Sequence, residues 1–170
     1  MISRDDLLHW FTYEPDNGVF RWRQSPANSV KVGDIAGSIY DVSKRQRRRL
    51  FLRGEKIASS RAAYMYEHGD IPANALIDHK DGDTLNDRID NLRLASAVQN
   101  NWNRLRGESL MQGVSKDERG RFKSRIQTPD GRKINLGTWA TEAEAHAAYM
   151  GAAAILHGEF WIGNRQANAA

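Results

Sequence analysis

The segment of residues 76–105 constrains the fold of this chain more than any other part of the sequence. Its pattern of apolar and polar residues predicts a strand at 77–79, an acidic loop, a second strand at 91–94 and then a helix. Ser96 and Gln99 have the spacing of a capping box, in which each side chain bonds the other residue's backbone N–H. The sequence therefore predicts a strand–loop–strand–helix unit here.

The N-terminal part predicts short helices and hairpins. A short capped helix is followed by a turn at residues 15–18, where Pro, Asp, Asn and Gly stand together. The pattern next predicts a strand at 19–23, a hairpin from 47–52 and 55–58, and a helix through 62–66. We expect Ser59 or Ser60 to cap that helix and Gly69 to end it.

The C-terminal part alternates between basic or polar and apolar residues. Residues 121–127 and 133–136 keep a period of two on either side of a turn at 129–131. Thr141 and Glu144 form a second capping box, and an alanine-rich helix runs from there to His157. We expect a three-stranded antiparallel sheet with a basic face, backed by this helix.

Together these elements predict an α+β protein built of small units. We expect a helix and strand module at 1–58, a core with its preceding helix at 59–105, a linker at 106–111, a sheet-and-helix domain at 112–164 and a tail at 165–170.

Charge and composition narrow the classes of function. The net charge is +4, and residues 44–53 include six basic side chains, whereas residues 70–93 include six Asp. Such basic flanks suit a polyanionic partner. The chain has no Cys, so disulfides and thiolate zinc sites are excluded and a metal would need O or N ligands. No apolar run is long enough to span a bilayer, and the N-terminus lacks a secretory pattern, so we expect a cytoplasmic protein with no membrane partner.

The central unit brings together residues suited to hydrolysis of a phosphodiester. The predicted helix would turn Asn100 back towards the strand that carries Asp78, so both could offer oxygens to a hard divalent cation. His79 could serve as a base, because an imidazole titrates near neutral pH. A base together with a cation at the leaving oxygen is what this reaction needs.

Asp78-His79, Asn91 and Asn100 resemble the pattern of the HNH (ββα-metal) endonucleases, particularly the homing endonucleases of phage introns. The resemblance implies that His79 is the general base, that Asp78 and Asn100 bind one Mg²⁺ or Mn²⁺, and that Asn91 braces the loop holding His79. It implies no organic cofactor. Asn100 stands where many relatives have His, a change that is typical of the homing branch and argues against tight transition-metal binding.

Other interpretations of this segment are weaker. A single His among Asp residues is usually a surface side chain, but its spacing to Asn91 and Asn100 favours a site. A calcium hand starting at Asp81 fails, because its sixth position is Asn86 and not glycine. The remaining acids Asp83, Asp87 and Asp90 are interpreted as solvated loop acids or caps.

The basic segments predict contacts with double-stranded DNA. The C-terminal region resembles the ethylene-response-factor (Apetala-type) DNA-binding domain, through residues 113–114, 136–139, 141–145 and 157–158. Ser115, Asp117, Gln127 and Asn135 stand where plant relatives carry Arg and Trp, so the plant target is not implied. The residues expected to contact DNA are Arg45, Arg47, Arg48, Arg49, Arg104, Arg121, Lys123, Arg125, Gln127, Lys133 and Asn135. A solvated hairpin edge at 45–49 and a solvated sheet face are the alternatives.

The function favoured by the sequence is a metal-dependent DNA endonuclease of the homing type, in a bacterium or a phage-infected cell. We expect a monomer, with a dimer as the alternative. A monomer could nick DNA and a dimer could cut both strands, and the sequence leaves both modes of cleavage open. Restriction or packaging remain alternative roles. A second hypothesis is a DNA-binding regulator that has kept the scaffold but lost catalysis. A third, an RNA-binding module, would require exposed aromatic residues on the basic sheet face, where the sequence has Arg, Lys and Gln.

Overall fold

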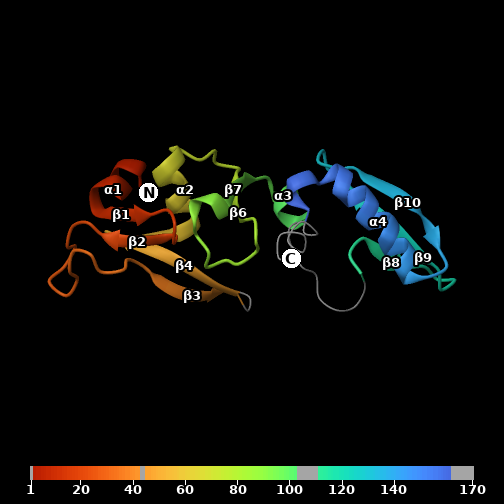
Figure 1. The fold of residues 1–170 in the computed structure, drawn as a ribbon, viewed down its shortest axis with the longest axis horizontal. Coiled ribbons are helices and arrows are strands. Elements are labelled where there is room, and N and C mark those ends of the chain that lie inside the picture. The colour runs from red at the N-terminus through yellow and green to blue at the C-terminus, as the bar shows by residue number, and fades with distance from the viewer. Residues whose placement is uncertain (1, 43–44, 103–110, 162–170) are drawn as a thin grey trace. The chain divides into compact units, whose positions relative to one another are not determined.

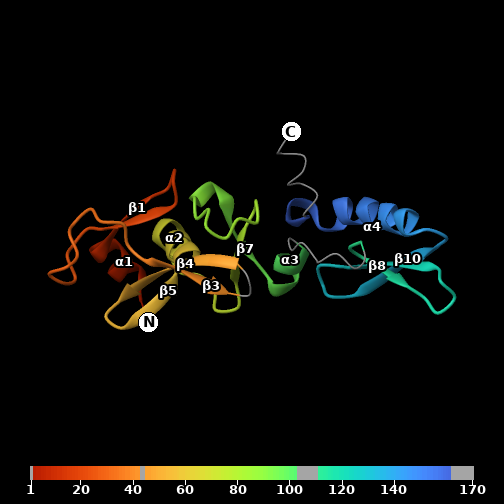
Figure 2. The same cartoon turned by 90° about the horizontal axis from the view of Figure 1, so that it is seen from below.

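The protein is described by a computed structural model that covers residues 2–42, 45–102 and 111–161 (Figures 1 and 2). The chain divides into two units, residues 1–95 and 96–170, which are described here one at a time. Arg104, most of the expected linker and the expected tail lie outside the described residues. The α+β class predicted from the sequence is confirmed in both units.

The first unit is built of small antiparallel sheets and two α-helices. Its elements are α1 (Arg4–Trp10), β1 (Phe11–Glu14), β2 (Val19–Trp22), β3 (Ser38–Val42), β4 (Arg45–Leu52), β5 (Glu55–Ala58), α2 (Ser59–His68), β6 (Leu76–His79), the 3-10 helix η1 (Ile89–Asn91) and β7 (Leu92–Ala95). The pairs β1–β2 and β6–β7 each form a two-stranded sheet, and β3, β4 and β5 form a third with β4 in the middle. The predicted hairpin of β4 and β5 is confirmed, and β1 and β3 are strands that the sequence pattern missed.

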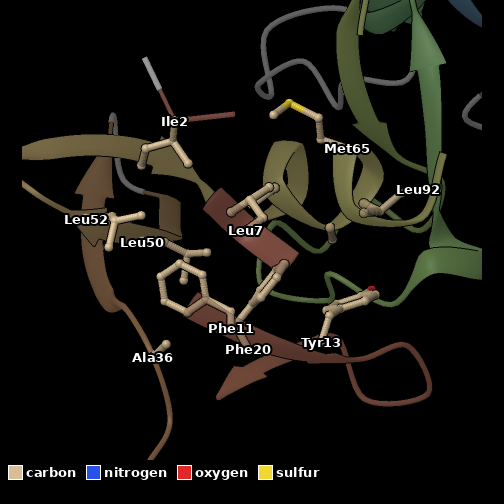
Figure 3. Close-up of a cluster of buried hydrophobic side chains, with 12 residues drawn as sticks. Ile2, Leu7, Phe11, Tyr13, Phe20, Ala36, Leu50, Leu52, Met65 and Leu92 are labelled. Atoms are coloured by element: carbon tan, nitrogen blue, oxygen red, sulfur yellow. The ribbon is translucent and has the colours of Figure 1, made fainter. Parts of the chain in front are cut away.

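One hydrophobic core holds these elements together (Figure 3). Phe11 and Phe20 face each other from the paired strands β1 and β2, with their ring centroids 6.0 Å apart in an edge-to-face arrangement. Leu7, Leu50 and Leu92 belong to the same buried cluster, although they come from distant parts of the sequence. The expected domain boundary at residue 58 therefore lies inside a shared core.

The start of α2 differs from the expectation that Ser59 or Ser60 caps it. Ala58 is the N-cap residue, in an extended conformation and without a side-chain cap, and Ser59 is already helical. The reason is that Ala58 still pairs with Arg49 in the sheet, so the chain passes from strand to helix without a separate capping residue. The predicted end of the helix at Gly69 is confirmed, where the backbone takes a φ of 88° that favours glycine.

The second unit is a three-stranded sheet with a helix on one face. Its elements are α3 (Ala97–Trp102), β8 (Val114–Lys116), β9 (Phe122–Gln127), β10 (Lys133–Trp139), α4 (Glu142–Leu156) and the 3-10 helix η2 (Gly158–Phe160). The strands run antiparallel with β9 in the middle, and α4 lies along one face of the sheet (Figure 2). The two capping boxes predicted at α3 and α4 are both present.

The core of the second unit is small. Ile126 from β9 packs against Tyr149 and Ala153 from α4, and Leu136 and Trp161 border this cluster. Small residues on α4 let the helix approach the sheet closely, as its alanine-rich sequence predicted. In the part of the chain that the structure describes, no helix has the length and apolar character needed to cross a membrane.

Candidate active site

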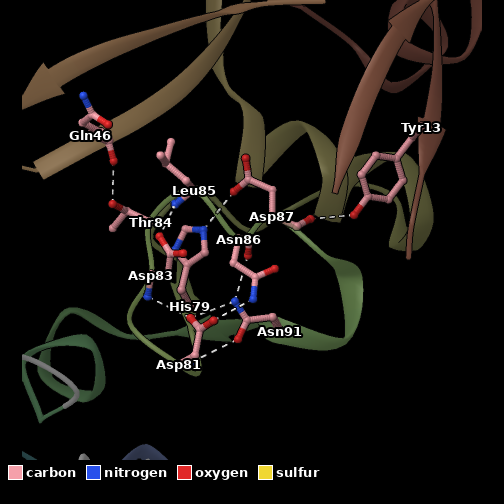
Figure 4. Close-up of polar contacts among 10 residues, drawn as sticks. All are labelled: Tyr13, Gln46, His79, Asp81, Asp83, Thr84, Leu85, Asn86, Asp87 and Asn91. Carbon is pink, nitrogen blue, oxygen red and sulfur yellow. Dashed lines mark hydrogen bonds and ion pairs between the residues drawn. The ribbon is translucent and has the colours of Figure 1, made fainter. Parts of the chain in front are cut away.

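His79 ends strand β6 and is held by a buried carboxylate (Figure 4). Its Nε2 lies 2.9 Å from Oδ1 of Asp87, and the His79 side chain is only 11% exposed while that of Asp87 is 2% exposed. The interpretation of Asp87 as a solvated loop acid is wrong. Asp87 is 1% exposed, and its backbone lies against Tyr13 of β1 and Gly18 of the following turn.

Two contacts with the β1–β2 hairpin fix the backbone at Asp87. The Tyr13 hydroxyl donates to the Asp87 carbonyl oxygen over 2.6 Å. Burial, and next the nearby Asp87 carboxylate, raise the pKa of the Tyr13 phenol, which therefore remains a proton donor. Gly18 lies so close that a Cβ atom there would be 2.5 Å from the Asp87 carbonyl carbon and the Arg88 nitrogen. The N-terminal hairpin is therefore part of the structure that positions this loop.

Asn91 binds the same loop from the other side. Its Nδ2 donates to Oδ1 of Asp81 over 3.0 Å and to the carbonyl oxygen of Asn86 over 2.8 Å. Its Oδ1 accepts a hydrogen bond from the Asp81 backbone N–H, and its own carbonyl oxygen accepts one from the N–H of Lys80. These contacts tie together the loop that follows His79, which is the arrangement that a bracing role for Asn91 requires.

Asp78 is buried beside Arg93, its partner across the β6–β7 ladder. Both Nε and Nη2 of Arg93 donate to Oδ2 of Asp78, at 2.9 Å and 2.8 Å. The ion pair offsets the cost of burying both charges and orients the carboxylate. Among the described residues, no group of three or more His, Cys, Asp or Glu side chains could hold a metal ion.

Asn100 lies in α3, which groups with the second unit. Within that unit, the Trp102 ring stacks on His157, with centroids 3.9 Å apart and planes 8° from parallel. His157 Nε2 is 3.0 Å from the carbonyl oxygen of Gln127, and burial lowers the pKa of this imidazole. Since the two units are described separately, the joint metal site of Asp78 and Asn100 stays a prediction.

The arginines of β4 divide between the two faces of their sheet. Leu50 and Leu52 are buried, so Arg48, two residues before Leu50, lies on the face of the core. Arg45, Arg47 and Arg49 all lie on the other face. There the guanidinium carbon of Arg49 lies 4.4 Å from the ring centroid of Tyr40 on β3 and 4.9 Å from that of Phe51. Three of the four predicted arginines therefore share one surface.

Strand β4 also contacts the loop that follows His79, because the Thr84 hydroxyl donates a hydrogen bond to the carbonyl oxygen of Gln46 on β4 (Figure 4).

In the second unit, most of the predicted DNA-contacting residues share the sheet face opposite α4. The register pairs Gln127 with Lys133 and Arg125 with Asn135, and all four are exposed. Lys123 belongs to the same alternation and is partly buried, whereas Ser124 and Ile126 are buried towards the helix. Arg121 precedes the strand, and its Nε lies 3.4 Å from Oδ2 of Asp117.

Comparison with known proteins identifies the class of the central part. Residues 58–102 match the family model described as HNH endonuclease, and a domain similar to these enzymes is therefore present there. The chain is also similar to Protein 3.8 of Escherichia phage T7, with 47% identity over 47 residues, which make up 28% of this chain and 39% of the phage protein. No solved structure matches the chain significantly. The matched family segment includes His79, Asp87, Asn91 and the helix α3.

Asp87 is the residue that sequence reasoning missed. Asp87 lies eight positions after His79 in an Asp-rich loop, and nothing in the sequence distinguishes one acid of this loop from the next. What distinguishes Asp87 is its contact in the structure with Tyr13, which lies 74 positions away in the chain.

Proposed function

We propose that this protein is a metal-dependent DNA endonuclease in which His79 is the general base. The observation that carries the proposal is His79 itself: it lies in the segment similar to HNH endonucleases, in a loop bonded by Asn91 and Asp87. An imidazole fixed in this way can take a proton from water as the water attacks the phosphorus atom. Such a base contributes roughly 10²–10⁴ in rate.

Asp78 and Asn100 are the residues that we propose to bind a divalent cation. Their oxygens fit a hard ion such as Mg²⁺ or Mn²⁺, which when bound would stabilise charge on the phosphate and the leaving oxygen. Arg93 supports this role because its two bonds to one oxygen of Asp78 fix the orientation of the carboxylate. Asn91 keeps the loop that follows His79 in one conformation.

DNA would be held by two basic surfaces. One is the β4 face with Arg45, Arg47 and Arg49, which starts beside the loop of His79 through the contact between Thr84 and Gln46. The other is the sheet face of the second unit with Lys123, Arg125, Gln127, Lys133 and Asn135. Basic side chains repeated along strands suit a phosphate backbone. Homing remains our preferred biological role, and an ethylene-response-factor type of domain remains our proposal for residues 112–164.

A regulator that binds DNA without cutting it is the second candidate. The observation that disfavours it is the buried pair of His79 and Asp87, because placing a carboxylate and an imidazole in the core is costly and brings no benefit to phosphate binding.

Plasmid cleavage with Mg²⁺, with and without a chelator, tests the proposal. We expect the native chain to cut supercoiled DNA only when the cation is present. His79→Ala should lower the cleavage rate by roughly 10²–10⁴, to a small residual rate, and leave DNA affinity nearly unchanged, because the residue acts on water and not on the backbone. Asp90→Asn is the matched control, since Asp90 is an exposed acid of the same loop. Full turnover by His79→Ala would remove the assignment of the base, and DNA binding without any cleavage by the native chain would favour the regulator.

A further inference from the structure

Asp87 is a buried acid that the proposed chemistry has not yet used. It is 1% exposed, and one of its oxygens, Oδ1, lies 2.9 Å from Nε2 of His79. Asp83 and Asp90 of the same loop are exposed. Burying a carboxylate is unfavourable unless it is paired, so the bond to His79 is the interaction that offsets the burial.

The position of Asp87 is determined from outside its own loop. Tyr13 donates to the Asp87 carbonyl oxygen, and Gly18 packs against the backbone of Asp87 and Arg88. The backbone N–H of Ile89 also donates to the carbonyl oxygen of Pro15 over 3.4 Å. All three contacts come from the hairpin of β1 and β2. The backbone that carries this carboxylate is thus held by the β1–β2 hairpin as well as by its own loop.

The direction of the hydrogen bond has a chemical consequence. An ionised carboxylate can only accept, so the bond to Asp87 requires the proton of His79 to be on Nε2. The lone pair is then on Nδ1, and this nitrogen is the one that can take a proton from water.

We infer that Asp87 is a positioning residue for the reaction, which fixes the tautomer and the ring orientation of His79 so that Nδ1 is the basic nitrogen. This inference rests on the proposed role of His79. It assigns the N-terminal hairpin a part in catalysis, because Tyr13 and Gly18 hold Asp87 in place.

The test compares two substitutions of Asp87 in the full chain. Asp87→Asn keeps the shape of the side chain, but its NH2 group can donate to Nε2 and favour the tautomer with the proton on Nδ1, so kcat should fall by roughly 10²–10⁴. Asp87→Leu removes the acceptor, and kcat should fall by roughly 10²–10⁴, while KM and DNA affinity stay within about twofold. Asp90→Asn is again the control. Turnover near the native value in Asp87→Asn or Asp87→Leu, or a loss that appears mainly in KM, would overturn the inference.

A double variant separates positioning from folding. If Asp87 acts only through His79, adding Asp87→Leu to His79→Ala should not lower the residual rate further. A second loss of the same size would show that Asp87 supports the fold or the substrate directly. Unfolding curves of each variant correct the rates for any unfolded fraction, and Asp87→Asn keeps the test decisive if the leucine variant does not fold.

The tautomer can be measured without any cleavage. In nitrogen-15 spectra of the His79 ring near neutral pH, we expect the pattern of a protonated Nε2 and an unprotonated Nδ1, and a mixture of tautomers in Asp87→Leu. The opposite tautomer in the native chain would overturn the inference. If the native chain has the expected tautomer but cuts no DNA under any metal condition, the proposed function fails while the pairing itself stands.

Discussion

The two units of this chain use buried and exposed polar groups in opposite ways. In the unit of residues 1–95, polar side chains lie in the interior. Asp78, Asp87, Asn91 and Arg93 are all buried, and each is hydrogen-bonded to another side chain of this unit. In the unit of residues 96–170, the polar side chains of β9 and β10 stand on an open sheet face above a small core. A reacting group needs a single orientation, whereas a surface for phosphate needs mainly charge and reach. We therefore expect substitutions in the first unit to affect rates and those in the second to affect affinity.

The metal ligands should give the largest effect, and they test whether α3 contributes to chemistry. We expect Asn100→Ala and Asp78→Asn each to lower the cleavage rate by roughly 10²-fold or more and to raise the Mg²⁺ concentration needed for half-maximal rate. Rates measured over a range of Mg²⁺ and Mn²⁺ concentrations check this. Asn101→Ala, an exposed neighbour on the same helix, is the control. An unchanged metal dependence in both variants would mean that the proposed ligand pair is incorrect.

Gly18 should show how far the first unit depends on close packing. An alanine there would have its Cβ 2.5 Å from backbone atoms, in addition to the strain of a φ of 71°. Gly54→Ala is the matched control, with a φ of 80° but no atom within 4 Å of the new Cβ. We expect Gly18→Ala to lower the free energy of unfolding by roughly 1–3 kcal/mol more than Gly54→Ala does, as measured by urea denaturation. Equal losses would mean that the hairpin adapts freely beside Asp87.

The sheet face of the second unit should separate into two kinds of contact. A side chain that touches only phosphate, for which we choose Lys133, should on substitution by Ala weaken binding to all sequences and reduce the salt slope by roughly 1. Arg125, if it reads a base edge, should cost about 1–3 kcal/mol on the true target and little on scrambled DNA. Binding isotherms at several salt concentrations distinguish these results. Uniform losses for both would make the sheet an electrostatic anchor only.

The smallest expected effect is a loss of stability in mild acid. Burial lowers the pKa of His157 in the folded chain below the ordinary value of 6.5. The unfolded chain therefore takes up a proton first, and the stability of the second unit should fall as the pH drops below about 6.5 towards the folded pKa. Urea midpoints followed by tryptophan fluorescence at several pH values measure this slope. It should be reduced in His157→Gln and kept in His68→Gln, a substitution at an exposed position of the first unit.

Local patterns in the sequence predicted most of the elements in both units. Capping boxes gave the starts of α3 and α4, and alternation gave β4, β9 and β10, because each of these signals acts within a few residues. Strand β1 was missed because it follows α1 directly, with no turn residue to mark the change. Its partner β2 was found from its alternating aromatic residues.

The site was predictable only where its residues form a motif. Asp78, His79 and Asn91 were chosen from their spacing, and Asn91 does bind the loop as expected. The burial of Asp87 depends on Tyr13, which no local pattern connects to it. The docking of Trp102 on His157 likewise depends on residues far apart in the chain, and so a boundary drawn from motifs places α3 with the first unit.

The packing of α3 has a consequence for how such a chain can be recombined. The segment similar to HNH endonucleases ends at residue 102, but its last helix uses Trp102 to stack on a histidine of the C-terminal unit. A hybrid that joins this segment to another C-terminal domain would leave the indole of Trp102 without its stacking partner. Exchange of the C-terminal unit therefore requires a junction before α3 or a new domain that supplies an aromatic surface. The packing of α3 thus limits which C-terminal units can be combined with this segment, and the sequence motifs do not show that limit.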